Sequence, residues 1–283
     1  MSSLYLVATP IGNLEDLSPR AARILGEVDV IAAEDTRRSR KLLTAFGIKA
    51  GALLAYHEHN EKKQALALCN MLDEGKSLAL VTDAGTPGIS DPGYRLVCEA
   101  IARGHDVIPI PGPNAAIALL GASGLPTDRF VFAGFVPQKE GARHKFFEDL
   151  LAERGTILMH ESPNRLEKTL KAIAQTLGPE RQLAIGRELT KLHEEILRGS
   201  VGEFLESLAG KTLPGEIVLA LEGDREKRPA PDQETIDAAI DEALHDRGLS
   251  VRDVSDLLAE RFSLPRKQVY RRALERAGRQ GPE

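Results

Sequence analysis

Long apolar runs are absent from this sequence. No stretch approaches the roughly 18 consecutive apolar residues that a membrane-spanning helix needs. Residues 1–12 also lack the basic-then-apolar order of a secretory signal peptide. We therefore expect a soluble, cytoplasmic protein with no membrane partner. Its 283 residues, 42% of them hydrophobic, can bury a sizeable core and predict two domains plus a smaller piece.

Cysteine is scarce, and positive charge is not in excess. Cys69 and Cys98 are far apart, in stretches of helical periodicity and without metal-ligand spacing. We expect neither a disulfide nor a metal site and interpret both as core residues. Lysine and arginine number 37 against 42 acidic residues, which gives a net charge of -5. This balance argues against a uniformly basic protein but allows local basic patches.

Several nucleotide-binding and hydrolase motifs are missing as well. The sequence has no GxxxxGK[ST] loop, no GxGxxG fingerprint, no G-x-S-x-G elbow and no H-E-x-x-H zinc motif. His57, Glu58 and His59 are candidate metal ligands, but neighbouring residues of a strand alternate between faces, so only the two histidines would share a side. We therefore predict no metal site.

A loop rich in glycine and proline, VTDAGTPGISDPG at residues 81–93, follows one predicted strand. Such a loop lets the backbone approach a ligand closely. Its acids, Asp83 and Asp91, and its lack of lysine would repel a pyrophosphate. They suit a ligand that is cationic or that donates hydrogen bonds from hydroxyl and amino groups, as S-adenosylmethionine does. The alternative is a tight turn whose glycines serve only chain reversal.

The first part of the chain alternates apolar runs with amphipathic stretches, which predicts a mostly parallel sheet with right-handed crossovers. Ligands of such sheets bind beyond the carboxyl ends of the strands, where this sequence is polar or rich in glycine and proline. The predicted strands span residues 4–8, 29–33, 53–56, 77–82 and 106–110, with helical patterns at 60–74 and 92–103.

After Arg129 some predicted strands lie too close together for a helix between them, so a second sheet, mixed or antiparallel, is expected. Its strands are predicted at residues 130–135, 156–160, 182–187, 194–197 and 216–221, with helices at 141–153 and 164–177. The fold class is thus α/β, with a first α/β domain at 1–112, a second at 113–223, a linker rich in charge and proline at 224–232 and a small all-helical domain at 233–283.

The helical domain changes its charge along the chain. Helices are predicted at 233–245, 251–262 and 266–277, and acidic residues dominate before Pro265 whereas basic residues dominate after it. This order resembles a helix-turn-helix module whose last, basic helix meets phosphates. The alternative is a solvated amphipathic face.

A second basic segment, TRRSRK at residues 36–41, follows the second predicted strand. If Asp35 or Thr36 caps a helix, four positive charges crowd its first turn, where the helix dipole disfavours them. That cost indicates an anionic partner, such as RNA phosphate. The alternative is pairing with Glu34, Asp35 and neighbouring acids.

A polar cluster, GRELTKLHEE at residues 186–195, follows a predicted strand of the second domain. It would deliver Arg187, Glu188, Lys191, His193 and Glu194 to one end of that domain. Such a cluster can hold a phosphate and accept a proton. An ion-paired connection between strands is the alternative.

Seven ordered segments together resemble a known family. They are VATPIGNLEDLS (7–18), AAEDTRRSRKLL (32–43), VTDAGTPGISDPG (81–93), PIPGPNAA (109–116), AGFVP (133–137), HESPNRL (160–166) and RELTKLHE (187–194). In this order they are similar to the bacterial 16S ribosomal RNA cytidine 2'-O-methyltransferases, class III methyltransferases of the tetrapyrrole methylase superfamily. The resemblance covers about residues 4–223, and the C-terminal helices resemble that family's helix-turn-helix extension. VATPIGN departs from the VGxGPGD-like opening of the porphyrin-type members, which puts a tetrapyrrole substrate in doubt.

The resemblance implies two α/β domains with S-adenosylmethionine in the cleft between them, and a homodimer. It also implies methylation of the ribose 2'-oxygen of a decoding-centre cytidine, cytidine 1402, with 16S rRNA or the small ribosomal subunit as partner. The expected cofactor contacts include Asp83, which belongs to the acidic loop at residues 81–93. In full they are Pro10, Ile11, Asp83, Ala84, Gly85, Thr86, Ile89, Asn114, Ala115 and Glu161.

Transfer to a hydroxyl needs help with one proton, so we expect Glu188 and Lys191 to be catalytic, with His57 as a weaker candidate. Two rivals stay open: a methylase of a small tetrapyrrole-like substrate or modified amino acid, and a non-catalytic RNA-binding protein. The expected RNA-binding residues are Arg37, Arg38, Arg40, Lys41, Arg266, Lys267, Arg271 and Arg272.

Overall fold

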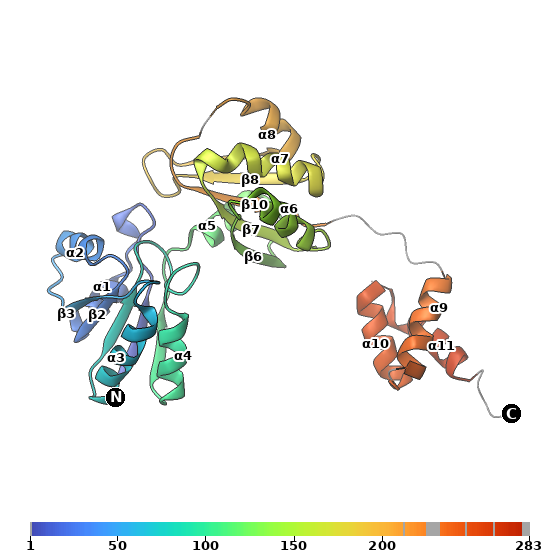
Figure 1. Ribbon diagram of the computed structural model, residues 1–283, viewed down its shortest axis with the longest axis horizontal. Helices are drawn as coiled ribbons and strands as arrows, with labels where there is room; N and C mark the ends of the chain where they lie inside the picture. Colours follow the sequence, from blue (N-terminus) through green and yellow to red (C-terminus); the bar gives the residue numbers. More distant parts are fainter. Residues whose placement is uncertain (1, 212, 225–232, 247, 263, 279–283) are drawn as a thin grey trace. The chain divides into compact units, whose positions relative to one another are not determined.

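The computed structural model describes residues 2–211, 213–224, 233–246, 248–262 and 264–278 (Figure 1). The chain divides into two compact units, Met1–Asp224 and Arg225–Glu283. The first contains two five-stranded sheets, and the described part of the second is helical. The predicted fold class is thereby confirmed. None of the helices described here is both long and apolar enough to span a lipid bilayer.

The first sheet is parallel throughout, with strand order β3-β2-β4-β1-β5. Because β1 and β4 are neighbours, the loops that follow them begin side by side at the carboxyl edge of the sheet. The strands are β1 (Ser3–Val7), β2 (Val30–Ala33), β3 (Ala52–Ala55), β4 (Leu78–Val81) and β5 (Asp106–Ile110).

Helices cover both faces of this sheet, and the alternation of side chains along the strands builds a core on each. Leu4 and Leu80 pack with α3 and α4, whereas Val7 and Val81 pack with α1 and α2. The helices are η1 (Leu14–Asp16), α1 (Pro19–Glu27), α2 (Thr36–Ala45), α3 (Glu61–Asp73) and α4 (Tyr94–Ala102).

The second sheet is mixed, as predicted: β6 and β7 are parallel, and the other neighbours in the order β6-β7-β10-β8-β9 are antiparallel. The strands are β6 (Phe130–Phe135), β7 (Thr156–Glu161), β8 (Gln182–Arg187), β9 (Glu195–Ser200) and β10 (Ile217–Leu221). Strand β9 runs further than the predicted 194–197, because it pairs with β8 over the full length of both strands.

One face of the second sheet packs on α5 (Ala115–Ser123), a helix that the sequence analysis did not place. Asn114 caps this helix, since its side chain accepts a hydrogen bond from Ile117 N at 3.1 Å. The opposite face is covered by α6 (Glu140–Asp149), α7 (Leu166–Thr176) and α8 (Val201–Ser207), with η2 (Pro163–Arg165) leading into α7.

The helical unit has its own core, in which Ile240, Val254 and Val269 are almost fully buried. Its elements are α9 (Gln233–Asp241), a π-helical turn (Glu242–Asp246), α10 (Val251–Phe262) and α11 (Arg266–Ala277). Apart from Asp224, the predicted linker at 224–232 lies outside the described residues, and the predicted domain boundaries stay predictions.

Two expectations from the sequence were wrong. Cys69 is buried on α3, but Cys98 is exposed on α4, because it lies on the side of that helix away from the core. The segment His57–His59 does not continue a strand: β3 ends at Ala55, and His57 N donates a hydrogen bond to Asn60 Oδ1 at 2.8 Å in a turn. Within the described ranges no cluster of side chains is suited to a metal ion.

Candidate active site

The loop after β4 is pinned to the loop after β1. Thr9 N donates to the Gly85 carbonyl at 2.9 Å, and Gly85 N donates to the Thr9 carbonyl at 3.0 Å. Gly85 has a φ of +86°, which side chains other than glycine rarely adopt. Thr86 Oγ1 donates to the Pro113 carbonyl at 3.1 Å and so adds the loop after β5. Three segments that the sequence analysis singled out therefore meet at one edge of the first sheet.

A cavity of about 450 Å³ lies against this edge; we call it the first cavity. Of the ten predicted cofactor contacts, all except Pro10 and Asp83 line it. Its lining contains Ile11, Ala84, Gly85, Thr86, Ile89, Ser90, Asp91, Asn114, Ala115, Phe135, His160, Glu161, Ser162, Pro163, Gly186, Leu189, Gly215, Glu216, Ile217 and Val218.

The second sheet supplies the wall that the sequence analysis largely missed. Strands β7 and β8 end at Glu161 and Arg187, and the antiparallel β10 begins at Ile217, so these ends share one edge. That edge brings Gly186 and the segment 215–218 into the cavity. The sequence predicted where these strands end, but only the pairing order of the strands shows which ends lie together in the cavity wall.

A second cavity of about 500 Å³ adjoins the first and shares Ile11, Ala84 and Glu216 with it. Unlike the first, it has cationic side chains in its wall. Its lining contains Thr9, Pro10, Ile11, Gly12, Leu14, Arg38, Ser39, Lys41, Leu42, Ala45, Thr82, Asp83, Ala84, Lys191 and Glu216.

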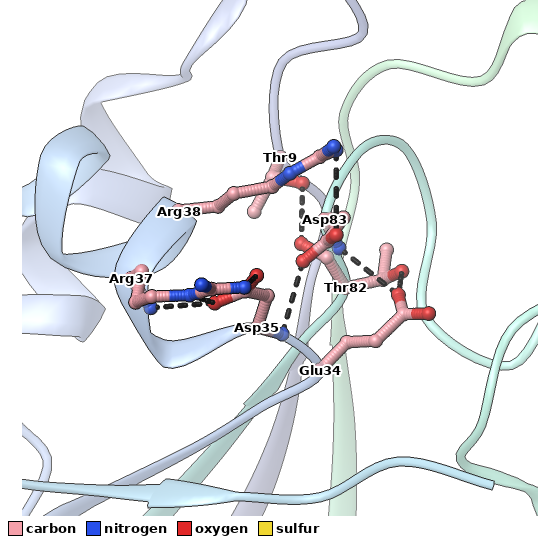
Figure 2. Close-up of polar contacts among 7 residues, drawn as sticks. All are labelled: Thr9, Glu34, Asp35, Arg37, Arg38, Thr82 and Asp83. Atoms are coloured by element: carbon pink, nitrogen blue, oxygen red, sulfur yellow. Dashed lines mark hydrogen bonds and ion pairs between the residues drawn. The ribbon is translucent and has the colours of Figure 1, made fainter.

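Polar contacts between the β2 and β4 loops shape one side of the second cavity (Figure 2). Arg38 reaches across to Asp83, with Nη1 3.3 Å from Oδ2, and Asp35 N donates to Asp83 Oδ1 at 3.0 Å. Thr82 Oγ1 donates to Glu34 Oε2 at 2.8 Å. Asp83 is thus held in the wall of the second cavity and not in that of the first.

Lys191 lies between two carboxylates at the border of the two cavities. Its Nζ is 2.9 Å from Glu188 Oε1 and 3.2 Å from Glu216 Oε2. Partial burial by itself would lower the pKa of Lys191, but the hydrogen bonds with Glu188 and Glu216 outweigh it and raise that pKa above its usual value. Lys191 is therefore an ammonium at neutral pH and is unsuited to act as a base.

Glu188 anchors this arrangement. Its Oε1 accepts a hydrogen bond from Glu216 N at 2.8 Å as well as the one from Lys191. These bonds, the one from Glu216 N first, lower the pKa of Glu188. Glu216 differs, because it lines both cavities and its side chain is 77% exposed. The carboxylate best placed to take a proton at the border is therefore Glu216, which the sequence analysis did not single out.

Residues 3–205 match the family model of the tetrapyrrole (corrin/porphyrin) methylases. The chain belongs to this family. Membership in a methylase family, together with the names of its relatives, makes it a methyltransferase.

Eight relatives that align over 77% or more of the chain are each named Ribosomal RNA small subunit methyltransferase I. The protein of Synechocystis sp. is 45% identical over 276 residues, covering 97% of this chain and 98% of the relative. That of Halalkalibacterium halodurans is 51% identical over 225 residues, with coverages of 80% and 77%. That of Escherichia coli O157:H7 is 43% identical over 280 residues, with coverages of 97% and 96%. The family resemblance seen in the sequence is confirmed.

Solved structures of more distant proteins share the fold. Uroporphyrin-III-C-methyltransferase from Thermus thermophilus superposes with a TM-score of 0.56 at 20% identity, covering 78% of this chain and 94% of that one. Diphthine synthase gives 0.59 at 15% identity, with coverages of 78% and 90%. At these identities the likeness concerns the fold alone.

In this methylase, Glu161 lines the first cavity, but both of its carboxylate oxygens already accept hydrogen bonds from other residues of the chain. Its buried carboxylate accepts hydrogen bonds from Thr169 Oγ1, from Ser162 N at 2.6 Å and from Arg165 Nη2 at 2.7 Å. These contacts fix the end of β7 beside the first cavity. A direct contact of Glu161 with a cofactor stays a prediction.

The basic start of α2 is less crowded than expected. Only Arg37 and Arg38 lie in its first turn, because the helix begins at Thr36, after the cap Asp35. Arg37 pairs with Asp35, whose pKa it holds well below the usual range, and Arg38 pairs with Asp83. Among the residues described, Arg40 and Lys41 have no ion-pair partner.

The cluster after β8 is partly an ion-paired connection, the alternative left open above. Arg187 Nε lies 3.1 Å from Glu195 Oε2, and Glu194 Oε2 accepts a hydrogen bond from Thr190 N at 2.5 Å. Lys191 and Glu188 are the members of this cluster that turn to the cavity border.

The basic last helix, α11, is also less free than the sequence suggested. Arg272 pairs with Asp237, with Nη2 2.9 Å from Oδ2, and Arg266 pairs with Asp256. These contacts lie inside the helical unit. Lys267 and Arg271 are exposed and form no ion pair within the part of the chain that is described.

Proposed function

We propose that this methyltransferase transfers a methyl group from S-adenosylmethionine to the ribose 2'-oxygen of a decoding-centre cytidine in 16S rRNA. The observation that carries the proposal is the pair of adjoining cavities, one without cationic side chains and one with Arg38, Lys41 and Lys191. The names of the relatives support an RNA substrate of the small ribosomal subunit.

The residues of the first cavity fit a cationic methyl donor. No lysine or arginine is among its described lining residues, whereas Asp91, Glu161 and Glu216 are. Burial lowers the pKa of His160 although Glu216 opposes this shift, so the imidazole is neutral at neutral pH. The volume is within the range of small-molecule sites. We propose that the backbone at residues 84–86, together with Asn114 and Ala115, holds the donor, which supplies a methyl group on a sulfonium.

Asp91 gives this fit a testable pH dependence. Burial raises the pKa of Asp91 to about 6, and Glu34 and Asp83 add to the rise while a hydrogen bond with Thr82 reduces it. Above pH 6 the group is a carboxylate that attracts a cation, and below pH 6 it is neutral. We expect the affinity for S-adenosylmethionine, measured by calorimetry, to fall about five- to tenfold between pH 7.5 and pH 5.

An Asp91→Asn variant separates this effect from other titrations. Glu34, Glu61, His57 and His59 also lie around Asp91. The variant should bind the donor more weakly at pH 7.5 and lose most of the change between the two pH values. If the variant keeps the pH dependence of the parent protein, Asp91 is not the group whose titration controls donor affinity.

We propose that the second cavity receives the target ribose and its flanking phosphates. Arg38 and Lys41 come from α2, and Lys191 comes from the turn after β8, so cations face the cavity from both sheets. Charge-assisted hydrogen bonds from such groups suit phosphate oxygens. The hydroxyl would then lie at the border with the first cavity, beside Lys191 and Glu216.

At that border the chain must orient the hydroxyl and remove its proton. We propose that the Glu216 carboxylate accepts the proton and that the Lys191 ammonium stabilises the negative charge that develops on the oxygen. Glu188 holds Lys191 in place. This assignment keeps both predicted catalytic residues in the site but gives the proton to Glu216.

The direct test is methyl transfer from radiolabelled S-adenosylmethionine to small ribosomal subunits, free 16S rRNA and a tetrapyrrole. We expect label in RNA, at a nucleotide whose 3'-phosphodiester resists alkaline hydrolysis, because a 2'-O-methyl group removes the attacking hydroxyl. Label in the tetrapyrrole alone would overturn the proposal in favour of a small substrate. Absence of donor binding would favour the non-catalytic RNA-binding rival.

Exposed cations of α11 should add to RNA affinity. A Lys267→Glu/Arg271→Glu variant is expected to weaken binding of 16S rRNA and to reduce the slope of log affinity against log salt by about one unit per lost phosphate contact. The measurement is a filter-binding series over salt concentration. If the variant has the same slope as the parent protein, the exposed face of α11 is solvated and does not bind RNA.

Arg272→Glu is the matched comparison on the same helix. Because Arg272 pairs with Asp237, its reversal should destabilise the helical unit and lower the temperature of unfolding. The double variant at Lys267 and Arg271 should unfold like the parent protein. This contrast separates loss of RNA contacts from loss of structure.

We also propose that the chain is a cytoplasmic homodimer, as the family resemblance implies. Sedimentation equilibrium of the full chain tests this, and a monomer at micromolar concentration would contradict it.

A further inference from the structure

A third cavity, of about 460 Å³, lies between α6 and α7 on the second sheet. These helices cover the face opposite α5 (Figure 1). The cavity shares no lining residue with the two cavities of the active site. Its lining contains Gln138, Glu140, Arg143, His144, Lys168, Lys171, Ala172 and Gln175.

Arg143 is the unusual member of this lining. The residue is only 6% exposed, and Nη1 donates to the Gln138 carbonyl at 3.2 Å. Its Nε is buried and has no hydrogen-bond partner, and no carboxylate of the described chain pairs with its guanidinium. A buried cation without a counterion is costly, since its lost hydration is not replaced. An anion bound beside Arg143 would therefore be stabilised by this uncompensated positive charge.

The surrounding side chains reinforce that charge. Lys168 and Lys171 follow one another on one face of α7, and Gln175 continues this face by one turn. Lys171 Nζ pairs with Glu167 Oε1 at 2.6 Å, whereas Lys168 is exposed and has no ion pair with any residue described. The one acid of the lining is Glu140.

We infer that this third cavity binds a phosphate group, contributed by the backbone of the RNA substrate. Planar guanidinium donors, flexible ammonium groups and amide N–H groups together match the several oxygens of a phosphate. The RNA source rests on the proposed function, which supplies a polyanion to this chain. The site then extends the RNA footprint from the methylated ribose to the outer face of the second sheet.

The test uses Lys168→Glu, with Lys145→Glu on α6 as control. Both positions are exposed and change the charge equally, but Lys145 does not line the cavity. In Lys168→Glu we expect the slope of log RNA affinity against log salt to fall by about 0.7 to 0.9, and the KM for small subunits at 0.1 M salt to rise about fivefold. The kcat should not change, and the control should match the parent protein.

A second arm uses inorganic phosphate, compared with chloride at equal ionic strength. We expect phosphate to raise the unfolding temperature of the parent protein and of Lys145→Glu, but not of Lys168→Glu. Equal salt slopes and KM values for the two variants would overturn the RNA assignment even if methyl transfer is intact.

If the parent protein methylates no RNA, the proposed function fails, while a Lys168-dependent phosphate effect still supports an anion site. Absence of that effect together with equal slopes overturns the site itself.

Discussion

Lys191→Met is expected to lower the kcat for methylation of small ribosomal subunits about 100- to 1,000-fold. The reason is that, in the proposed mechanism, the ammonium held by Glu188 and Glu216 at the border of the two cavities stabilises charge on the attacking oxygen. Methionine keeps much of the length and the apolar stem but has no N–H donor. The measurement is single-turnover methyl transfer with RNA and donor both saturating, so that binding losses do not enter.

Two further variants define the cause of that loss. Lys41→Met removes a cation from the same second cavity that forms no ion pair with Glu216 or with any other residue described, and should raise KM with little change in kcat. Gly12→Ala keeps Lys191 but adds a Cβ that would clash with Lys191 Cγ, so it should reproduce part of the loss in kcat by displacement. A Lys191→Met enzyme with the kcat of the parent protein would contradict the assigned role.

Glu216→Gln is expected to lower kcat about 100-fold, because the amide cannot accept the hydroxyl proton. Glutamine preserves the size of the side chain in both cavities, so RNA affinity should change little and donor affinity should fall only by the loss of one largely exposed charge. Calorimetry with S-adenosylmethionine and filter binding with RNA check this, and quenched single-turnover assays give the rate.

Glu188→Gln serves as the control, since Glu188 lines neither active-site cavity and acts through Lys191. Its loss should be smaller, about tenfold. Residues that act as a unit are not additive, so Lys191→Met combined with Glu216→Gln should lose little beyond the larger single effect. If Glu188→Gln is slower than Glu216→Gln, the proton acceptor is Glu188, one of the two residues expected from the sequence to be catalytic.

Much of the first cavity's lining was predictable, because it consists of loops that begin where parallel strands end. Residues 84–86 follow β4, and Asn114 follows β5, so a strand assignment alone places them at one edge. The cavity lining that comes from the second sheet was harder to predict from the sequence. Glu216 precedes an antiparallel strand, and no motif marks it; only the pairing of β10 between β7 and β8 brings it to the edge.

Charge was the property that the sequence described least well. Asp83 and Asp91 lie in one loop, yet Asp83 pairs with Arg38 in the second cavity whereas Asp91 is half-buried in the lining of the first. Arg271 and Arg272 are neighbours, but only Arg272 meets Asp237, 35 positions earlier in the chain. Ion pairing depends on distances of a few ångströms between residues that are remote in sequence, so a count of charges cannot give it.

The family, the alternation of strands and helices, and the glycine-rich loops at the strand ends were all predictable from the sequence, because local periodicity and backbone freedom depend on consecutive residues. Only the packing of distant segments shows which carboxylate lies at the border of the cavities, which arginines pair with acids, and that Arg143 is buried with no counterion among the residues described. Those properties arise when distant segments are packed together, where burial and pairing set the cost of each charge.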